Sequence, residues 1–347
     1  MSRVLGQRAV RYLAIALRHA CPVLLTLLGV SVVVFVLMRV VPGDPVAMMI
    51  PPGASPEDIL RLRAFYGLDR SIPAQYGLWL LHAVQGEFGT SIGFKQDVLG
   101  LIGQHLPATL ELGFTALVFA VLAGGIAGVV SAAMHGRWIS SLTDATAAAV
   151  QAVPDFLWGL VFILLFGVVW IWMPISGRLD PLLDFHSATG FVFFESLLRG
   201  RFDVTASVFS HSVAPALALA LPVAAMIARV LKASMQEALA SDYVLLARLK
   251  GLSATRVLLV EALPNAVTPT LQLTGVQFAF LLGGTVLIER LFSYPGIGSL
   301  SISAVVARDL PLIQGVVLTF AVLFIAINLV VEALTVALNP RLRGQQR

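Results

Sequence analysis

Long apolar runs dominate the chain and set its expected architecture. A helix rises about 1.5 Å per residue, so roughly 20 apolar residues are needed to cross the hydrocarbon layer of a membrane. About six windows of the sequence meet this requirement, near residues 20–40, 108–133, 145–173, 212–231, 271–290 and 312–338. The pattern predicts an all-α polytopic membrane protein with about six transmembrane helices.

Prolines interrupt two of these windows. Pro154, followed by Asp155, breaks the third window, and Pro215 and Pro222 lie in the fourth. Transmembrane bundles tolerate such prolines where neighbouring helices satisfy the freed backbone groups. We therefore retain both windows as spans.

The first window must be distinguished from a cleavable signal peptide, because several arginines precede it. The apolar stretch from Cys21 to Met38 is longer than a signal core, and no small-x-small cleavage site follows it. We expect this stretch to remain as the first span.

Composition supports a membrane protein over a soluble one. Of the 347 residues, 58% are hydrophobic and only 12% are charged, against about 25% charged in an average soluble domain. The net charge of +4 comes from basic residues scattered between apolar runs, which favours membrane lipid over nucleic acid as the partner. The single cysteine, Cys21, excludes an intrachain disulfide.

Basic residues predict the orientation of the chain. If both termini are cytoplasmic, one side of the membrane receives most of the Lys and Arg residues in short segments, as the positive-inside rule requires. These residues are Arg3, Arg8, Arg11, Arg18, Arg137, Arg229, Lys232, Arg248, Lys250, Arg256, Arg341, Arg343 and Arg347.

Three regions are expected along the chain. Residues 1–41 form a cytoplasmic N-terminus and the first span, and residues 42–107 form an extracytoplasmic helical loop with short helices near 55–67 and 73–85. Residues 108–347 form a core of five spans, with a second external loop at 174–211 and a cytoplasmic loop at 234–266.

Motifs for enzymatic chemistry are absent from the sequence. There is no G-x-x-x-x-G-K-[ST] for nucleotide phosphates, and no H-E-x-x-H, C-x-x-C or G-x-S-x-G. Gly296 and Gly298 make an incomplete dinucleotide fingerprint, better interpreted as a tight turn after Pro295. We expect no enzyme, no cofactor and no metal site in this chain.

Three acidic residues lie within or near the apolar windows: Glu111, Asp155 and Glu332. Such groups are candidates for proton relays, but a carboxylate that snorkels to the interface or caps a helix accounts for each of them more simply. An ion-coupled secondary transporter or channel stays open as an alternative function.

The segment at 234–266 is too polar for lipid yet has strong helix formers from 235 to 250. Gly251 stands where a helix C-terminal stop would lie, and Ser253 can cap a second helix that runs to about Leu263. The pattern predicts a helix, a glycine turn and a helix beneath the membrane.

This segment and the rest of the chain resemble the binding-protein-dependent permeases of type I ABC importers, in particular the dipeptide, oligopeptide and nickel permease branch. In the cytoplasmic loop the resemblance rests on Glu237-Ala238, Asp242-Tyr243, Ala247-Arg248, Lys250-Gly251-Leu252-Ser253 and Asn265-Ala266. Elsewhere it rests on Pro42-Gly43-Asp44-Pro45, Gly86-Glu87-Phe88-Gly89, Leu106-Pro107-Ala108-Thr109-Leu110, Pro295-Gly296-Ile297-Gly298 and Arg308-Asp309. Leu249, Glu261 and Pro264 depart from the usual residues of the branch.

The resemblance implies that a short cytoplasmic helix docks on a separate ATPase and transmits its movement to the spans. The residues implied in this coupling are Glu237, Ala238, Asp242, Tyr243, Ala247, Arg248, Lys250 and Gly251. Small Ala238 and Ala247 would allow close approach, and Gly251 would allow the turn. A solvated amphipathic linker is the plainer alternative for the same segment.

The resemblance also implies an assembly. A second homologous permease, two ATP-binding subunits and an extracytoplasmic solute-binding protein would join this chain in a bacterial inner membrane, with ATP hydrolysed by the partners. The chain would form half of a translocation path for peptides or a related small solute such as nickel.

Candidates for lining that path come from the fifth window. Gln272, Thr274 and Gln277 form a polar stripe at approximate helical spacing, and Thr274, Gln277 and Phe278 are the residues we expect to face the path. Interhelical hydrogen bonding is the alternative role for such a stripe. Close helix contact at the bundle or pore is one role for Gly124, Gly125, Gly128, Gly283 and Gly284, and ordinary packing is the favoured alternative.

Overall fold

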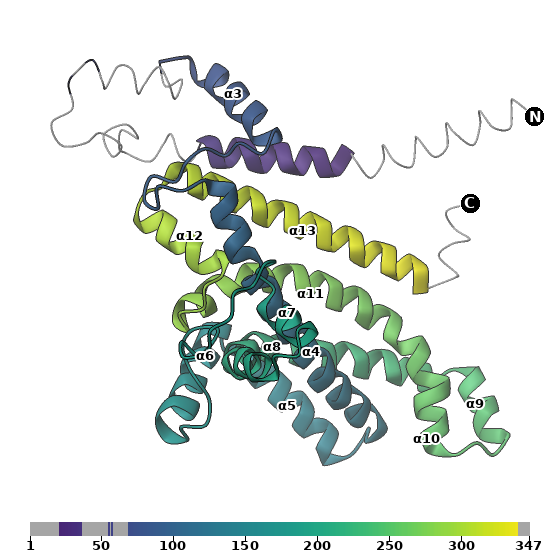
Figure 1. Cartoon of the computed structure of the whole chain (residues 1–347). Coiled ribbons are helices and arrows are strands. Elements are labelled where there is room, and N and C mark those ends of the chain that lie inside the picture. Colours follow the sequence, from purple (N-terminus) through teal and green to yellow (C-terminus); the bar gives the residue numbers. More distant parts are fainter. Residues whose placement is uncertain (1–20, 37–54, 56, 58–68, 339–347) are drawn as a thin grey trace, which may run out of the picture. The chain divides into compact units, whose positions relative to one another are not determined.

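A computed structural model describes residues 21–36, 55, 57 and 69–338 of the chain. Its helices run in the order Cys21–Val36, α3 (Ile72–Val84), α4 (Val98–Ala133), α5 (Trp138–Ala152), α6 (Asp155–Ile163), α7 (Val192–Leu198), α8 (Phe202–Leu239), α9 (Asp242–Leu249), α10 (Ala254–Arg256), α11 (Leu263–Leu291), α12 (Ile297–Val306) and α13 (Leu310–Leu338) (Figure 1). π-Helical segments follow α6 at Leu164–Val169 and join α10 to α11 at Val257–Ala262. Within the described residues β pairing is limited to one bridge, Thr90 with Asp97, so the all-α expectation is confirmed.

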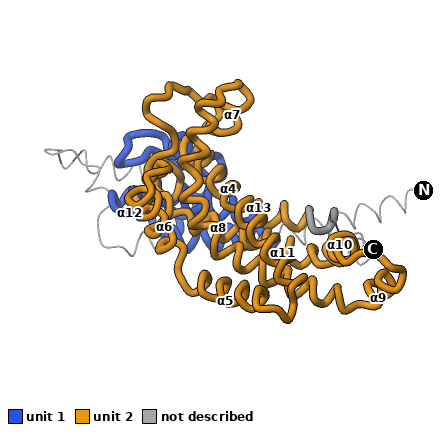
Figure 2. Tube along the Cα trace, turned by 90° about the horizontal axis from the view of Figure 1, so that it is seen from below, with its two compact units in different colours: residues 1–102, 303–325 blue, residues 103–302, 326–347 orange. Residues whose placement is uncertain are grey.

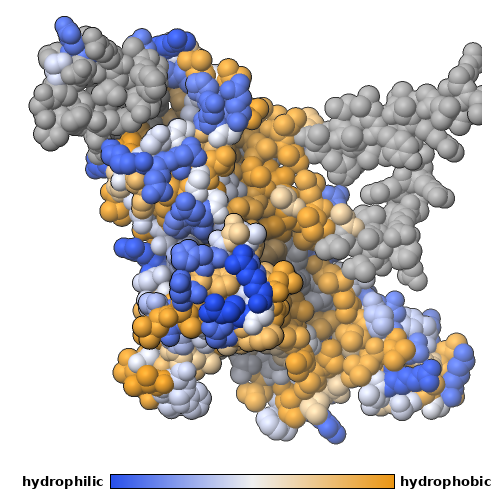
Figure 3. Space-filling model, in the orientation of Figure 1, coloured by the Kyte–Doolittle hydropathy of each residue, from blue (hydrophilic) through white to orange (hydrophobic). Residues whose placement is uncertain are grey.

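Among the described residues, four helices are long and apolar enough to cross a membrane: Val98–Ala133, Phe202–Leu239, Ala254–Leu291 and Leu310–Ala333. A fifth candidate is the bent pair Trp138–Ala152 and Asp155–Val169. The apolar helix Cys21–Val36 coincides with the first expected span, whose remaining residues lie outside the described part of the chain. Apolar side chains cover much of the surface seen in Figure 3, as a lipid-facing protein requires.

Several span boundaries differ from those expected. Helix α4 begins at Val98 and takes Pro107 into its interior, and α8 extends at both ends beyond the expected 212–231. The expected ranges were set by apolar length alone, whereas helical hydrogen bonding continues through the polar flanks. The expected division at residue 107 therefore falls within α4, and the division of the chain into regions stays a prediction.

Pro154 produces a sharp bend in the third span. Helices α5 and α6 meet at 96°, with extended backbone at Val153 (φ −103°, ψ 125°) and Pro154 (φ −57°, ψ 148°). The indole Nε1 of Trp158 donates across the break to the carbonyl of Val150 at 3.3 Å. The prediction of a broken span is thus confirmed, with a bend close to a right angle.

The chain divides into two compact units (Figure 2). Unit 1 comprises residues 1–102 and 303–325, and unit 2 comprises residues 103–302 and 326–347. In unit 1 the fully buried Asp309 accepts hydrogen bonds from the hydroxyl of Ser91 at 2.5 Å and the backbone N–H of Gly93 at 2.9 Å. Asp309 also caps α13 through the N–H of Leu312 at 3.3 Å.

The outer helices of unit 1 were predicted in part. Helix α3, Ile72–Val84, matches the expected 73–85, and Gly86 beyond it has a φ of +83° suited to a helix stop. The expected helix near 55–67 lies outside the described residues, apart from Ser55 and Glu57.

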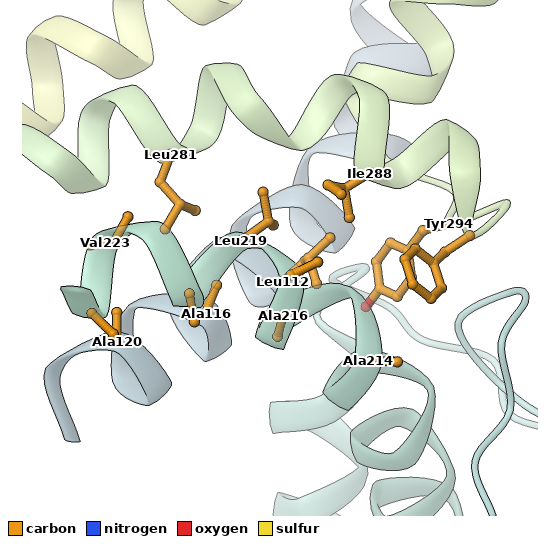
Figure 4. Close-up of a cluster of buried hydrophobic side chains, with 14 of the residues drawn as sticks. Leu112, Ala116, Ala120, Ala214, Ala216, Leu219, Val223, Leu281, Ile288 and Tyr294 are labelled. Atoms are coloured by element: carbon orange, nitrogen blue, oxygen red, sulfur yellow. The ribbon is translucent and has the colours of Figure 1, made fainter. Parts of the chain in front are cut away.

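The core of unit 2 lies between α4, α8 and α11 (Figure 4). It is built largely from small residues, so the helix backbones approach closely. A Cβ on Gly124 would lie 2.5 Å from the carbonyl oxygen of Ala224, and one on Gly128 would lie 3.0 Å from that of Ala228. The close-contact role is therefore confirmed for these two glycines, whereas Gly125 and Gly283 have open space beside them.

Helix α12 was not predicted. We expected a tight turn after Pro295, but a helix begins at Ile297. The cause is Glu289, a fully buried residue of α11 that the sequence reasoning missed. Its carboxylate accepts the backbone N–H of Ser299 at 2.9 Å and thereby caps the new helix.

Thr109 of α4 joins Glu289 to α12. Its hydroxyl donates to Glu289 at 2.7 Å and accepts the N–H of Ile297 at 2.8 Å. Gly296 leaves room for the carboxylate, since a Cβ there would overlap the carboxyl group of Glu289. The Pro-Gly-Ile-Gly sequence thus serves to start a helix against a buried acid.

Glu111 and Arg178 form a second polar contact in unit 2. Their side chains pair at 2.6 Å with little exposure, and Glu111 also accepts the N–H of Phe193 at 3.0 Å. Arg178 donates to the carbonyl of Gly190 at 2.8 Å as well. Glu111 therefore binds the segment 178–193 and accepts an N–H from the first turn of α7, as the helix-capping interpretation expected, and it does not snorkel to the interface.

Candidate functional site

The candidate site is the hairpin that follows α8. Figures 1 and 2 place α9 and α10 at one end of unit 2, with α6 toward the opposite end. The expected single helix from 235 to 250 is wrong, because α8 ends at Leu239 and α9 begins at Asp242. Ser241 stands between them with extended backbone (φ −78°, ψ 155°), the conformation that serine favours before a helix. Glu237 and Ala238 consequently belong to the last turn of α8.

Gly251 ends α9 in a Schellman motif. The N–H of Leu252 bonds the carbonyl of Ala247 at 3.3 Å, and the N–H of Gly251 bonds that of Arg248 at 2.9 Å. Gly251 has a φ of +77°, which an L side chain adopts only at a cost. The glycine turn predicted from the sequence is confirmed.

Ser253 caps the second helix, as predicted, by accepting the N–H of Arg256 at 3.4 Å. The helix does not stop at Leu263, because helical backbone continues without a break through Leu291. The hairpin is therefore joined directly to the span that contains α11.

Helix α9 packs against the beginning of that helical run. Val244, Ala247 and Val257 are buried together, with Leu239 and Leu252 beside them. The small side chain of Ala247 thus serves a contact inside this chain, and Ala238 is likewise buried, against α4 and α11 residues. Because residues on both sides of the turn pack against the spans, the hairpin is fixed to them.

The outer face of α9 is exposed. Tyr243, Leu245, Leu246 and Leu249 are exposed, Leu249 to 76%. Asp242 and Arg248 of the same short helix are exposed, as are Lys250 directly after it and Glu237 in the last turn of α8. Hydrophilic side chains gather beside apolar ones at this end of the surface in Figure 3. Such a mixed face is typical of a surface that binds another protein.

A cavity of about 800 Å³ separates the hairpin from the ends of α4 and α8. The imidazole Nδ1 of His135 and the amide Nε2 of Gln236 lie 2.7 Å apart in its wall. Its lining residues are Ala132, Ala133, His135, Gln236, Leu239, Ala240, Arg248, Leu252, Ala254, Thr255, Val257 and Leu258. Nearby, Lys232 of α8 pairs with Asp144 of α5 at 2.5 Å.

The expected path-lining residues do not form one exposed stripe. Thr274 is buried and donates its hydroxyl to the carbonyl of Thr270 at 2.7 Å, and Gln277 donates to the sulfur of Met226 at 2.8 Å. Phe278 is half-buried, and Gln272 is exposed. Gln277 therefore makes the interhelical contact that was the alternative role of the stripe.

Tyr294 is the largest fully buried side chain of unit 2, and it points toward Leu112 in Figure 4. Burial raises the pKa of its phenol, which keeps the group neutral. Within the described residues, no cluster of three or more His, Cys, Asp or Glu could hold a metal ion.

The roles of Glu289, Arg178 and Asp309 were not predicted, because each depends on a contact with a residue far away in the sequence. A usable signal was present at Glu289, an acid at a helix end that precedes a Gly-x-Gly helix start. The pairing of Glu111 with Arg178 has no such signal, since 67 residues separate the two.

Two family models match the chain. Residues 100–344 match the model described as "Binding-protein-dependent transport system inner membrane component", and residues 11–113 match "Binding-prot-dependent transport system membrane comp, N-term".

Characterised relatives extend over nearly the whole chain. It is 39% identical over 326 residues to the di/tripeptide transport system permease protein DppB of Pseudomonas aeruginosa, which covers 92% of this chain and 96% of that protein. It is 35% identical over 334 residues to the dipeptide transport system permease protein DppB of Escherichia coli K12, covering 95% and 98%. It is 36% identical over 318 residues to the glutathione transport system permease protein GsiC of the same strain, covering 92% and 95%.

Among solved structures, the fold is similar to a chain of the MetNI methionine ABC transporter in an inward-facing conformation. The TM-score is 0.53 at 15% sequence identity, over 70% of this chain and 97% of that one. At this identity the likeness shows the fold alone.

Proposed function

Because this chain belongs to the family of binding-protein-dependent transport system inner membrane components, we propose that it forms half of the translocation path of an ATP-driven importer of short peptides. It is a multi-pass membrane protein, and its family consists of transporter components rather than enzymes. Beyond the family, we propose four properties of the chain: its solute, its partners, its orientation and the residues that couple the spans to ATP hydrolysis.

The solute class rests on the relatives. Three relatives at 35–39% identity transport dipeptides, di- and tripeptides or glutathione by their names. All three names describe short peptides, so this class is proposed ahead of nickel or longer oligopeptides. An ion-coupled carrier or channel is not favoured by any of these similarities.

The coupling element is the hairpin from Glu237 to Gly251. A partner must favour one of two states by about 5.5 kcal/mol to switch a path almost completely, and only an element fixed to the spans can transmit such a bias. Helix α9 meets this condition through the buried contact of Val244 and Ala247 with Val257, which continues into α11. This contact is the observation on which the coupling role rests.

Roles within the hairpin follow from exposure. Glu237, Asp242, Tyr243, Arg248 and Lys250 are exposed and would contact the ATPase. Ala238 and Ala247 are buried and would fix the hairpin to the spans, and Gly251 would set its turn.

The partners are a second homologous permease, two ATP-binding subunits that hydrolyse ATP, and an extracytoplasmic solute-binding protein. The hairpin would lie in the cytoplasm of a bacterium together with both termini, and the chain would reside in the inner membrane. This orientation puts Arg137, Lys232, Arg248 and Lys250 on the cytoplasmic side, in agreement with the positive-inside rule.

Uptake by reconstituted vesicles tests the proposal. The permease pair and its ATPase subunits are inserted in liposomes, and labelled Ala-Ala is supplied with the binding protein outside and ATP inside. Accumulation should require all of these parts, and omission of ATP, the ATPase or the binding protein should each abolish it. Uptake that continues without ATP and follows an ion gradient would establish the carrier alternative instead.

A further inference from the structure

Polar side chains that have no part in the proposed coupling lie at the bend between α5 and α6. Asp155 is the first residue of α6 and is partly exposed. Gln151 lies in the last turn of α5, and its side-chain Nε2 is buried without a partner among the described residues. Both residues flank a break inside a candidate membrane span.

The carboxylate of Asp155 has spare hydrogen-bonding capacity. One oxygen accepts the N–H of Phe156 at 2.8 Å. The other lies against Gly284 of α11, 3.1 Å from where a Cβ would stand. In the described part of the chain no Lys, Arg or His pairs with Asp155, whereas Asp144 three turns earlier is paired with Lys232.

The surroundings of the bend are open. Ala152, Pro154 and Phe156 are exposed, and the adjoining Gly283 of α11 is exposed with free space beside it. A helix break leaves backbone groups unpaired, and within a membrane such groups are tolerated only inside protein or beside water. A partly exposed carboxylate in hydrocarbon is costly as well.

Lipid therefore does not account for this surface, which within a membrane must face another protein or a water-filled path. The bend lies midway along the pair, with the 15 residues of α5 on one side and the 15 residues from Asp155 to Val169 on the other. In secondary transporters, broken helices near the bilayer midplane form the solute sites.

We propose that Asp155, at the bend of α5 and α6 beside Gly283 and Gly284, contacts a cationic group of the solute in the translocation path. In a short peptide this group is the α-ammonium, which an unblocked peptide always carries. The contact rests on the proposed function, to which it adds a residue that selects charge inside the membrane. The low-dielectric walls of such a path focus the field of a carboxylate, which therefore attracts a cation.

Thiol labelling tests the contact without requiring transport. Cys21 is the only cysteine of the chain, so Cys21→Ser gives a background in which Ala152→Cys introduces one thiol beside the bend. The assembled complex in membranes is treated with a cationic or an anionic methanethiosulfonate, both impermeant. With Asp155 present, the cationic reagent should react about tenfold faster than the anionic one, relative to their rates with a free thiol.

Asp155→Asn removes the charge and keeps an oxygen that can accept the N–H of Phe156, so the bend is preserved. In that variant the preference for the cationic reagent should disappear. Asp144→Asn, a charge removal on the same helix pair, is the matched control and should leave the preference unchanged. An introduced thiol at position 152 that neither reagent reaches, or that both reach without charge preference, would overturn the proposal.

The side of access distinguishes a path from an outer surface. The thiol of Ala152→Cys should react from the inside without nucleotide and from the outside after trapping with ATP and vanadate. Reaction from one side in both states, in a complex that imports Ala-Ala, would overturn the contact while leaving the proposed function intact. A complex with no ATP-driven uptake would contradict the proposed function, and the charge preference of the thiol at position 152 could still be measured.

Discussion

At the scale of single residues, the backbone conformation of Gly251 alone decides the cost of a substitution there. Its φ of +77° strains an L side chain, whereas the space beside it is open. Gly251→Ala should therefore cost about 1 to 2 kcal/mol through the backbone only, whereas Gly251→Asn should cost less because asparagine tolerates this conformation. We expect peptide uptake per ATP hydrolysed to fall in the Ala variant and to recover largely in the Asn variant.

Gly200 provides the matched control for this prediction. It ends α7 in the same motif, with a φ of +70°, open space beside it and a bond from the N–H of Arg201 to the carbonyl of Ser196 at 2.9 Å. Gly200→Ala should impose similar strain outside the coupling element and leave the ratio of uptake to hydrolysis unchanged. Equal loss in both Ala variants would contradict a specific coupling role for Gly251.

The hydrogen bonds of Glu195 make the stability of the segment before α8 depend on pH. The Ser187 hydroxyl above all, with the N–H groups of Ala188 and Thr189, lowers the pKa of this carboxylate from 4.5 to about 2. A lowered pKa in the folded state stabilises the loop above pH 4.5, and the stabilisation is lost as the pH falls toward 2. Hydrogen exchange at residues 187–199 should become faster over this window in the wild type, relative to Glu195→Gln. Parallel curves for the two proteins would contradict the assignment.

At the scale of elements, the start of α12 depends on Thr109. Thr109→Val leaves a carboxylate oxygen of Glu289 and the N–H of Ile297 without this partner, both in buried positions. An unsatisfied buried group costs about 1 to 3 kcal/mol, so the Tm of the purified complex should fall by several degrees.

Thr115→Val on the same helix is the control for Thr109. The hydroxyl of Thr115 only bonds the carbonyl of Glu111 one turn earlier, so its removal leaves no buried partner on another element. A change in Tm as large as that of Thr109→Val would argue against the role given to the contact with Glu289.

Elements were predictable where a periodic or compositional signal is local. The apolar windows located the spans, and the Gly251 and Ser253 signals located the hairpin turn, because caps and stops act within a few residues. The break at Ser241 was missed because good helix formers surround it, and α12 was missed because its cap comes from Glu289 on another helix. A contact between two elements cannot be inferred from the residues of either element alone.

At the scale of the whole molecule, the family and the fold were predictable because ordered motifs extend from one end of the chain to the other. The path-lining role of Thr274, Gln277 and Phe278 stays a prediction, because the hydrogen bonds of Thr274 and Gln277 do not show where the path runs. The proposed cation contact at Asp155 depends on a 96° bend that the proline indicated without its angle. The cation contact was inferred from the direction of the helices at the bend and the exposure of the side chains there, which residue type alone does not predict.

The central claim is that α9 meets a separate ATPase on the cytoplasmic side, and photo-crosslinking tests it most directly. A photoreactive amino acid is placed at Leu246, an exposed position of α9, or at Leu198, an exposed position of α7. Irradiation of the complex in membranes should join Leu246, and not Leu198, to an ATPase subunit. An adduct of the ATPase with position 198, or none with position 246 in a complex that transports, would contradict the account.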